Sequence, residues 1–243
     1  MRRNANDLYP LTSLLHLMSK LKREGQLNMK VLIVGANGKI GKMIVDKLHE
    51  SDQHSVRAMV RKPEQANALD MKGVEACLTD LEGPIEAIQN ALEGIDAVIF
   101  SAGSGGKTGY DKTLAIDLDG AVKVMDAAKE VGVDRFVMVS AMNSDDRAAW
   151  DNEEMKPYNI AKYYADRCLK QSGLTYTILR PGLLKDDPAT GKIEVATNLP
   201  GGAISREDVA EVAIASLSNE ATFNKEFDLL NGDTPIDEAL KNI

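Results

Sequence analysis

Short apolar runs alternate with amphipathic stretches along most of the chain from Met29 onward. The runs have the length of strands, and the stretches between them carry apolar residues at the three- and four-residue spacing of a helix. Strands are predicted at 30–34, 54–60, 74–78, 97–100, 135–140 and 175–179. Helices are predicted between them at 39–50, 64–72, 84–92, 110–131 and 156–171. This alternation is typical of a parallel sheet with helices on both faces.

The C-terminal part of the chain follows a different pattern. Residues 185–202 are rich in Pro, Gly and Asp, with room for a short strand at 192–196. Ser205 has the signature of a helix N-cap, because acidic residues follow it in the first turn. That helix is expected to end at about residue 217, before a seventh strand at 226–230 and a closing helix at 236–242. We therefore predict an α/β, Rossmann-like fold: a single domain with a doubly wound parallel sheet of about seven strands.

Residues 1–28 lie outside this pattern. Arg2 and Arg3 precede an apolar stretch, as in a secretory leader, but charged residues interrupt the stretch and no small-residue cleavage site follows. Because Met29 opens the first strand directly, we expect it to be the true start and residues 1–28 to be a mis-assigned extension. A genuine helical extension is the alternative.

Composition narrows the classes of protein and partner. Of the 243 residues, 44% are hydrophobic and 27% charged, as in ordinary globular proteins. No run reaches the roughly 18 apolar residues of a membrane helix, and two cysteines fit a reducing cytoplasm better than a disulfide framework. From Met29 onward, 24 Lys and Arg face 35 Asp and Glu, a balance that repels polyanions. We expect a cytoplasmic protein with neither nucleic acid nor membrane as a partner.

The first predicted strand runs into Gly35, Gly38 and Gly41, and a helix follows. In a dinucleotide-binding turn the first glycine allows the sharp bend and the second lets the backbone approach a pyrophosphate. The third lets the helix pack close to the sheet, and the N–H groups of the helix N-terminus face the anion. We interpret 29–243 as an NAD(P)-binding domain.

The end of the second strand indicates which dinucleotide is preferred. NAD-binding folds place an acidic residue there for the adenosine ribose, whereas this chain has Arg61 and Lys62. A guanidinium can bind a 2′-phosphate through two hydrogen bonds. The sequence therefore favours NADP over NAD, although a solvated strand end also explains the two cations.

A Tyr-x-x-x-Lys pair, Tyr158 and Lys162, lies on the helix after the fifth strand. Residues four apart share a helix face, and a nearby ammonium is expected to lower the pKa of the phenol. Tyr158 would then exchange a proton with a substrate oxygen while a hydride moves to or from the nicotinamide.

Together these segments resemble the short-chain dehydrogenase/reductase superfamily. The resemblance is strongest to its atypical bacterial members, which carry NAD(P)H-binding, NmrA-like or sugar-epimerase names, and it extends from Met29 to the C-terminus. The matching segments are 35–41, 57–61, 80–81, 101–103, 117–120, 135–140, Tyr158 with Lys162, 180–182 and 205–210.

The resemblance implies a role for each matching position. The implied cofactor-binding residues are Gly35, Asn37, Gly38, Lys39, Ile40, Gly41, Arg61, Asp80, Leu81, Ser101, Ala102, Gly103, Lys162 and Pro181. Residues 35–41 would wrap the pyrophosphate, Arg61 would hold the adenosine phosphate, and 80–81 would meet the adenine. Residues 101–103 would lie on the ribose side. Lys162 would bond the nicotinamide ribose and Pro181 would border the nicotinamide. Structural alternatives are a helix N-cap for Asp80 and a strand terminator for Pro181.

The third catalytic residue of the family, a Ser or Thr just beyond the fifth strand, has an uncertain counterpart. Ser140 ends that strand and is the candidate. In many relatives the working hydroxyl lies one or two residues later, where this chain has Ala141 and Met142. Asn143 and Ser144 are the remaining substitutes.

These observations favour an enzyme, an NADPH-dependent oxidoreductase acting on a small carbonyl compound or quinone. A nucleotide-sugar epimerase or dehydratase is the second hypothesis, but only about 60 residues follow the sixth strand to hold a bulky substrate. A non-catalytic NADP-binding redox sensor is the third, favoured by the missing hydroxyl and opposed by the Tyr158–Lys162 pair. The expected partner is a small-molecule substrate. The sequence is compatible with a monomer and with a homodimer.

Two further features lie near the predicted site. The loop 103–109 ends in Gly-Lys-Thr-Gly, but residue 101 is serine where a phosphate-binding P-loop needs glycine. We expect this loop to be a flexible lid beside the nicotinamide. Trp150 either walls the substrate pocket or packs its own loop.

Overall fold

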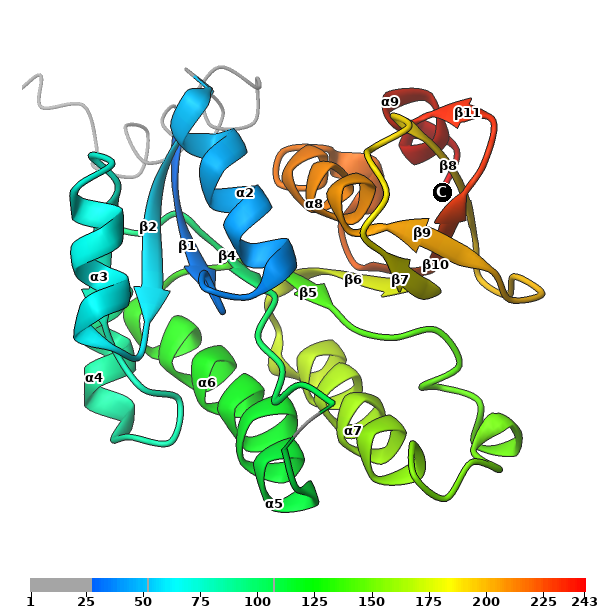
Figure 1. Cartoon of the computed structure of the whole chain (residues 1–243), viewed down its shortest axis with the longest axis horizontal. Helices are drawn as coiled ribbons and strands as arrows, with labels where there is room; N and C mark the ends of the chain where they lie inside the picture. Colours follow the sequence, from blue (N-terminus) through cyan, green and yellow to red (C-terminus); the bar gives the residue numbers. More distant parts are fainter. Residues whose placement is uncertain (1–27, 52, 107) are drawn as a thin grey trace, which may run out of the picture.

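The computed structural model describes residues 28–51, 53–106 and 108–243 (Figure 1). The extension expected at 1–28 lies outside these residues except for Asn28. The strands of the main sheet are β1 (Met29–Val34), β2 (His54–Val60), β3 (Glu75–Leu78), β4 (Ala97–Phe100), β5 (Arg135–Val139), β6 (Thr175–Pro181), β8 (Lys192–Ala196), β10 (Lys225–Asn231) and β11 (Thr234–Pro235). Their order is β11-β8-β10-β6-β5-β4-β1-β2-β3.

The sheet is parallel from β3 to β10, as the strand–helix alternation predicts. It has nine strands in place of about seven, because β8 and β11 add an antiparallel edge beyond β10. A separate two-stranded sheet joins β7 (Leu183–Lys185) to β9 (Ala203–Ser205). Strands of two or three residues are too short to show an alternation of apolar and polar residues in the sequence, so β7, β9 and β11 were not predicted.

Helices cover both faces of the sheet (Figure 1). They are α2 (Lys39–Glu50), α3 (Pro63–Asp70), α4 (Ile85–Ala91), α5 (Tyr110–Lys112), α6 (Ala121–Val131), α7 (Lys156–Ser172), α8 (Arg206–Ala215) and α9 (Ile236–Ala239). One apolar core lies between the sheet and α2, α8 and α9, and the other lies beneath α4, α6 and α7. Because both faces are covered, β4 and β5 are buried along their whole length.

The helix expected over 110–131 is divided in the structure. Between α5 and α6 the chain forms a π-helix, Thr113–Gly120. A β-carbon at Gly120 would lie 3.2 Å from the side chain of Leu81, so the two segments approach closely here. The wider turn contains Asp117, which is buried. Apolar spacing over two turns does not separate α- from π-helical hydrogen bonding, so the sequence could not predict this.

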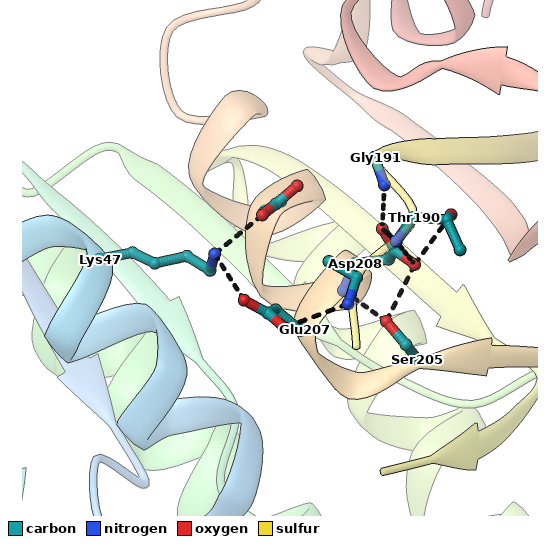
Figure 2. Close-up of polar contacts among 8 residues, drawn as sticks. Lys47, Thr190, Gly191, Ser205, Glu207 and Asp208 are labelled. Atoms are coloured by element: carbon teal, nitrogen blue, oxygen red, sulfur yellow. Dashed lines mark hydrogen bonds and ion pairs between the residues drawn. The ribbon is translucent and has the colours of Figure 1, made fainter. Parts of the chain in front are cut away.

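Ser205 caps α8 as predicted, since its hydroxyl accepts a hydrogen bond from the Asp208 N–H at 2.9 Å (Figure 2). The Asp208 carboxylate in turn accepts hydrogen bonds from the N–H groups of Thr190 and Gly191 and from the Ser205 hydroxyl. These contacts tie the loop before β8 to the first turn of α8 and so position the C-terminal segment.

The described residues show neither a helix long and apolar enough to cross a membrane nor a group of three or more His, Cys, Asp or Glu suited to a metal ion.

Candidate functional site

A cavity of about 250 Å³ opens at the carboxyl ends of β1, β2, β3 and β4. The predicted cofactor residues that line it are Gly35, Asn37, Gly38, Arg61, Asp80, Leu81, Ser101, Ala102 and Gly103. Gln65, Thr79 and Ile116 also line it, and sequence reasoning did not select them. The sequence carries no local pattern that identifies these three residues, because they lie at the cavity only as a result of the strand order in the sheet.

The glycine turn has the geometry that an anion cradle needs. Gly35 has a φ of +86°, which L-residues rarely adopt. A β-carbon there would lie 2.6 Å from the Ala102 backbone, and one at Gly41 would collide with the Gly35 carbonyl. No side chain caps the α2 N-terminus, and its first turn holds no acidic residue. Its N–H groups are therefore available to a phosphate.

The remaining members of the turn do not line the cavity. Ile40 and Gly41 are buried in the first turn of α2. The Lys39 ammonium instead contacts a carboxylate oxygen of Asp186 at 2.6 Å, and the Arg206 guanidinium contacts the other oxygen at 2.7 Å. In this structure Lys39 thus connects the turn to the segment after β7.

The rim at the end of β2 is cationic. Arg61 is exposed at the cavity, and the described residues offer it no salt-bridge partner, whereas Lys62 lies 3.8 Å from Glu64. Asp80 lines the cavity and also accepts a hydrogen bond from the Glu82 N–H at 3.0 Å. Because the N-cap of α4 is Pro84, Asp80 closes a turn, and the alternative of a helix N-cap is wrong.

Tyr158 and Lys162 lie on one face of α7, where the Lys162 ammonium is 5.7 Å from the centre of the Tyr158 ring. Lys162 is 3% exposed. It donates to the Val139 carbonyl at 3.2 Å and lies 3.5 Å from the Asp117 carboxylate. That carboxylate also accepts from the Ser104 N–H at 2.9 Å. Asp117 therefore connects the Tyr–Lys pair with Ser104, which directly follows the segment 101–103 that lines the cavity.

The pKa of Tyr158 is raised, contrary to the expectation from its pairing with lysine. Burial raises it, and the attraction of the Lys162 ammonium is opposed by the carboxylates of Asp117 and Asp166. Burial lowers the pKa of Lys162, but Tyr158, Asp117 and Asp166 more than offset this and raise it overall. The free protein therefore holds Tyr158 as a neutral phenol and Lys162 as an ammonium.

Ser140 directly follows β5 and is buried, and its hydroxyl makes no hydrogen bond of good geometry with the described residues. It lies near enough to Asp166 to lower the pKa of that carboxyl. Beyond it, the Met142 N–H donates to the carbonyl of Pro181, which is buried at the end of β6 outside the cavity. Ser144 is also buried, and the part of the chain that the structure describes offers its hydroxyl no hydrogen-bond partner. None of these positions presents an exposed hydroxyl.

Trp150 packs its own loop. Its indole N–H donates to the Asn143 carbonyl at 3.1 Å, and its ring meets Tyr163 of α7 edge to face. Asn143 itself has a φ of +63°. In the loop 103–109, residue 107 lies outside the described residues, and the expected role of this loop as a lid stays a prediction.

A glycine turn, a cationic strand end and a cavity at the carboxyl edge of a parallel sheet define a dinucleotide-binding protein. A protein-family model described as NAD(P)H-binding matches residues 35–220. The chain belongs to this NAD(P)H-binding family.

The names of similar proteins refer to different activities. A Bacillus subtilis (strain 168) protein called uncharacterized sugar epimerase YhfK is 54% identical over 215 residues, which cover 88% of this chain and 100% of that protein. Sanguinarine reductase of Eschscholzia californica is 32% identical over 258 residues, which cover 88% and 93%. The crystal structure of the oxidoreductase ylbE from Lactococcus lactis superposes with a TM-score of 0.79 at 34% identity, covering 88% and 96%.

Proposed function

We propose that this protein is an NADPH-dependent oxidoreductase that reduces a small carbonyl compound or a quinone. The observation that carries the proposal is the Tyr158–Lys162 pair, connected through Asp117 to a cavity whose rim holds Arg61. Relatives named as a reductase and an oxidoreductase support the same class of reaction.

The residues present fit a phosphorylated dinucleotide. The cradle at Gly35 and Gly41 leaves no room for β-carbons, and the first turn of α2 holds no acidic residue that would repel an anion. Arg61 would hold the 2′-phosphate, and 80–81 and 101–103 would hold the adenosine half. Lys162 would bond the nicotinamide ribose, and Pro181 would border the ring. When bound, the cofactor supplies a hydride.

Tyr158 would act as the acid in this reaction. Because its pKa is raised, the phenol keeps its proton at neutral pH and can give it to a substrate oxygen that gains negative charge. Lys162 would stabilise the phenolate that remains. This protonation state suits reduction of a carbonyl better than oxidation of an alcohol.

A redox sensor that binds NADP without turnover is a second candidate. It is favoured by the burial of Ser140 and by Ala141 and Met142, which leave no exposed hydroxyl to orient a substrate oxygen.

The test is a fluorescence titration with NADPH and NADH. Arg61→Ala should weaken NADPH binding roughly 10- to 100-fold and leave NADH binding unchanged, as expected for the loss of a charged hydrogen bond. Lys62→Ala, which removes the neighbouring cation, is the matched control and should have a smaller effect. Equal affinity for both dinucleotides would contradict the NADP preference, and binding of neither would overturn the proposal.

Turnover is measured next on a panel of carbonyl compounds and quinones. Tyr158→Phe should lower kcat by a factor on the order of 10² to 10⁴ without loss of NADPH binding. Tight binding of NADPH with no reduction of any acceptor would favour the sensor.

A further inference from the structure

Asp166 continues the stripe of Tyr158 and Lys162 along α7, because it follows Lys162 by the same four residues. It is 2% exposed. One carboxylate oxygen accepts from the Arg180 guanidinium at 3.2 Å. The other is buried and makes no hydrogen bond of good geometry with the described residues, although the Ser140 hydroxyl lies close enough to lower the pKa of this carboxyl. A buried carboxylate that is incompletely hydrogen-bonded is costly.

Arg180 compensates Asp166 only in part, because it is shared among three carboxylates. Its terminal nitrogens contact Asp145 and Glu226, each at 2.7 Å, and these distances are shorter than its contact with Asp166. The second cation that acts on Asp166 is Lys162, one turn earlier on the same helix.

The charged and titratable groups around Lys162 come from every element packed there. They are Tyr158 and Asp166 on α7 and Asp117 on the π-helix, and Arg180 on β6 acts on Asp166. Lys162 thus interacts electrostatically with two carboxylates and one phenol. A change in the charge of one of these groups changes the electrostatic potential at the other two, which adds to or opposes the potential of the ammonium.

We propose that Asp166 sets the proton affinity of Tyr158 by opposing the charge of the Lys162 ammonium that lies between them on α7. An ionised Asp166 opposes the field of the ammonium at the phenol, and the phenol keeps its proton. When Asp166 takes up a proton, that opposition ends and the phenolate becomes easier to form. The consequence for catalysis rests on the proposed function, whereas the electrostatic coupling exists in the free protein.

The charge of Asp166 changes within a physiological range of pH. Burial raises the pKa of its carboxyl from 3.8 to about 6, although Arg180, Ser140 and Lys162 lower it. Above this pH Asp166 is ionised and holds the proton on Tyr158. Below it, Asp166 is neutral, and the proton affinity of Tyr158 falls.

The test follows the ¹³Cζ signal of Tyr158 during a pH titration of the free protein, with Tyr158→Phe to assign the signal. Asp166→Asn should lower the pKa of Tyr158 by about one unit, which is a tenfold larger phenolate fraction at a given alkaline pH. Asp145→Asn is the matched control. It removes a carboxylate from the same Arg180, but one that is 42% exposed and is not among the main groups that shift the pKa of Lys162 or Tyr158, so Tyr158 should titrate nearly as in the wild type.

A folded Asp166→Asn protein in which Tyr158 titrates unchanged would overturn the proposal. Should that variant not fold, the wild type alone decides, because the Tyr158 signal must then show a second inflection near pH 6 that matches the ¹³Cγ titration of Asp166. Its absence would equally overturn the proposal. Both measurements use neither cofactor nor substrate, so a failure of the proposed reductase activity leaves their outcome unaffected.

Discussion

At the scale of single residues, the pairing of Tyr158 with Lys162 follows from local spacing, but its electrostatics do not. Asp117 contacts Lys162 from the π-helix, which is separated from α7 in the chain by α6 and β5. Arg180 contacts Asp166 from β6, the strand that follows α7. The sequence predicted a lowered pKa for Tyr158 because it showed the ammonium and not the burial. In the folded protein, burial and two carboxylates outweigh that ammonium.

Asp166 should make the protein less stable as the pH rises from 4 to 7. Since its pKa is raised from 3.8 to about 6, the folded protein binds more protons than the unfolded chain in this range, and releasing them lowers the free energy of unfolding. The effect corresponds to about 3 kcal/mol. Urea unfolding at several pH values should show Asp166→Asn gaining this amount relative to the wild type between pH 4 and 7. Parallel pH dependences of the two proteins would contradict it.

At the scale of elements, the segment 205–208 at the start of α8 fixes the loop before β8 and contacts α2, and we refer to it as the clamp. Asp208 is buried and holds Thr190, Gly191 and the Ser205 hydroxyl, while Glu207 contacts the Lys47 ammonium of α2 at 2.9 Å (Figure 2). The sequence predicted the cap because the N-cap signature is local. The loop that Asp208 holds was not predicted, because its partner groups lie in a segment without a period.

Replacing Asp208 with Ala should lower the free energy of unfolding by about 3 kcal/mol. The substitution removes a buried carboxylate that accepts hydrogen bonds from the partly buried N–H groups of Thr190 and Gly191 and from the Ser205 hydroxyl. Glu211→Ala is the control, since it removes only a partly exposed ion pair with Lys47 and should cost less than about 1 kcal/mol. Equal losses in urea unfolding of the two variants would argue against the clamp.

At the scale of the whole molecule, the cavity exists because β1 lies between β2 and β4 in the sheet. This order brings the glycine turn, Arg61 and the segment 101–103 to one edge, although they are far apart in the chain. Alternation of strands and helices predicted a parallel sheet and its edge. The short strand expected at 192–196 is present as β8, but neither β11 nor the antiparallel pairing of β8 with β10 was predicted, because that pairing depends on contacts between separate segments.

Binding at this edge should stabilise the whole domain. At 100 times its dissociation constant, NADPH adds about 2.7 kcal/mol to the free energy of unfolding, which for a domain of this size raises Tm by roughly 5 to 10 °C. Differential scanning fluorimetry with equal concentrations of NADPH and NADH measures this. The rise should be smaller with NADH and smaller with NADPH for Arg61→Ala. An equal rise with both dinucleotides would speak against a role for Arg61 in binding the 2′-phosphate.

The amino-acid sequence by itself determined the strand–helix alternation, the glycine turn, the cap of α8 and the Tyr158–Lys162 pair. Each of these depends on residues within about one turn or one strand of each other, so their spacing carries the information. Only the tertiary structure decided the cavity, the π-helical turn that contains Asp117, and the burial of Ser140, Lys162 and Asp166. These depend on which distant segments meet and how much water they exclude, and a pKa depends on both.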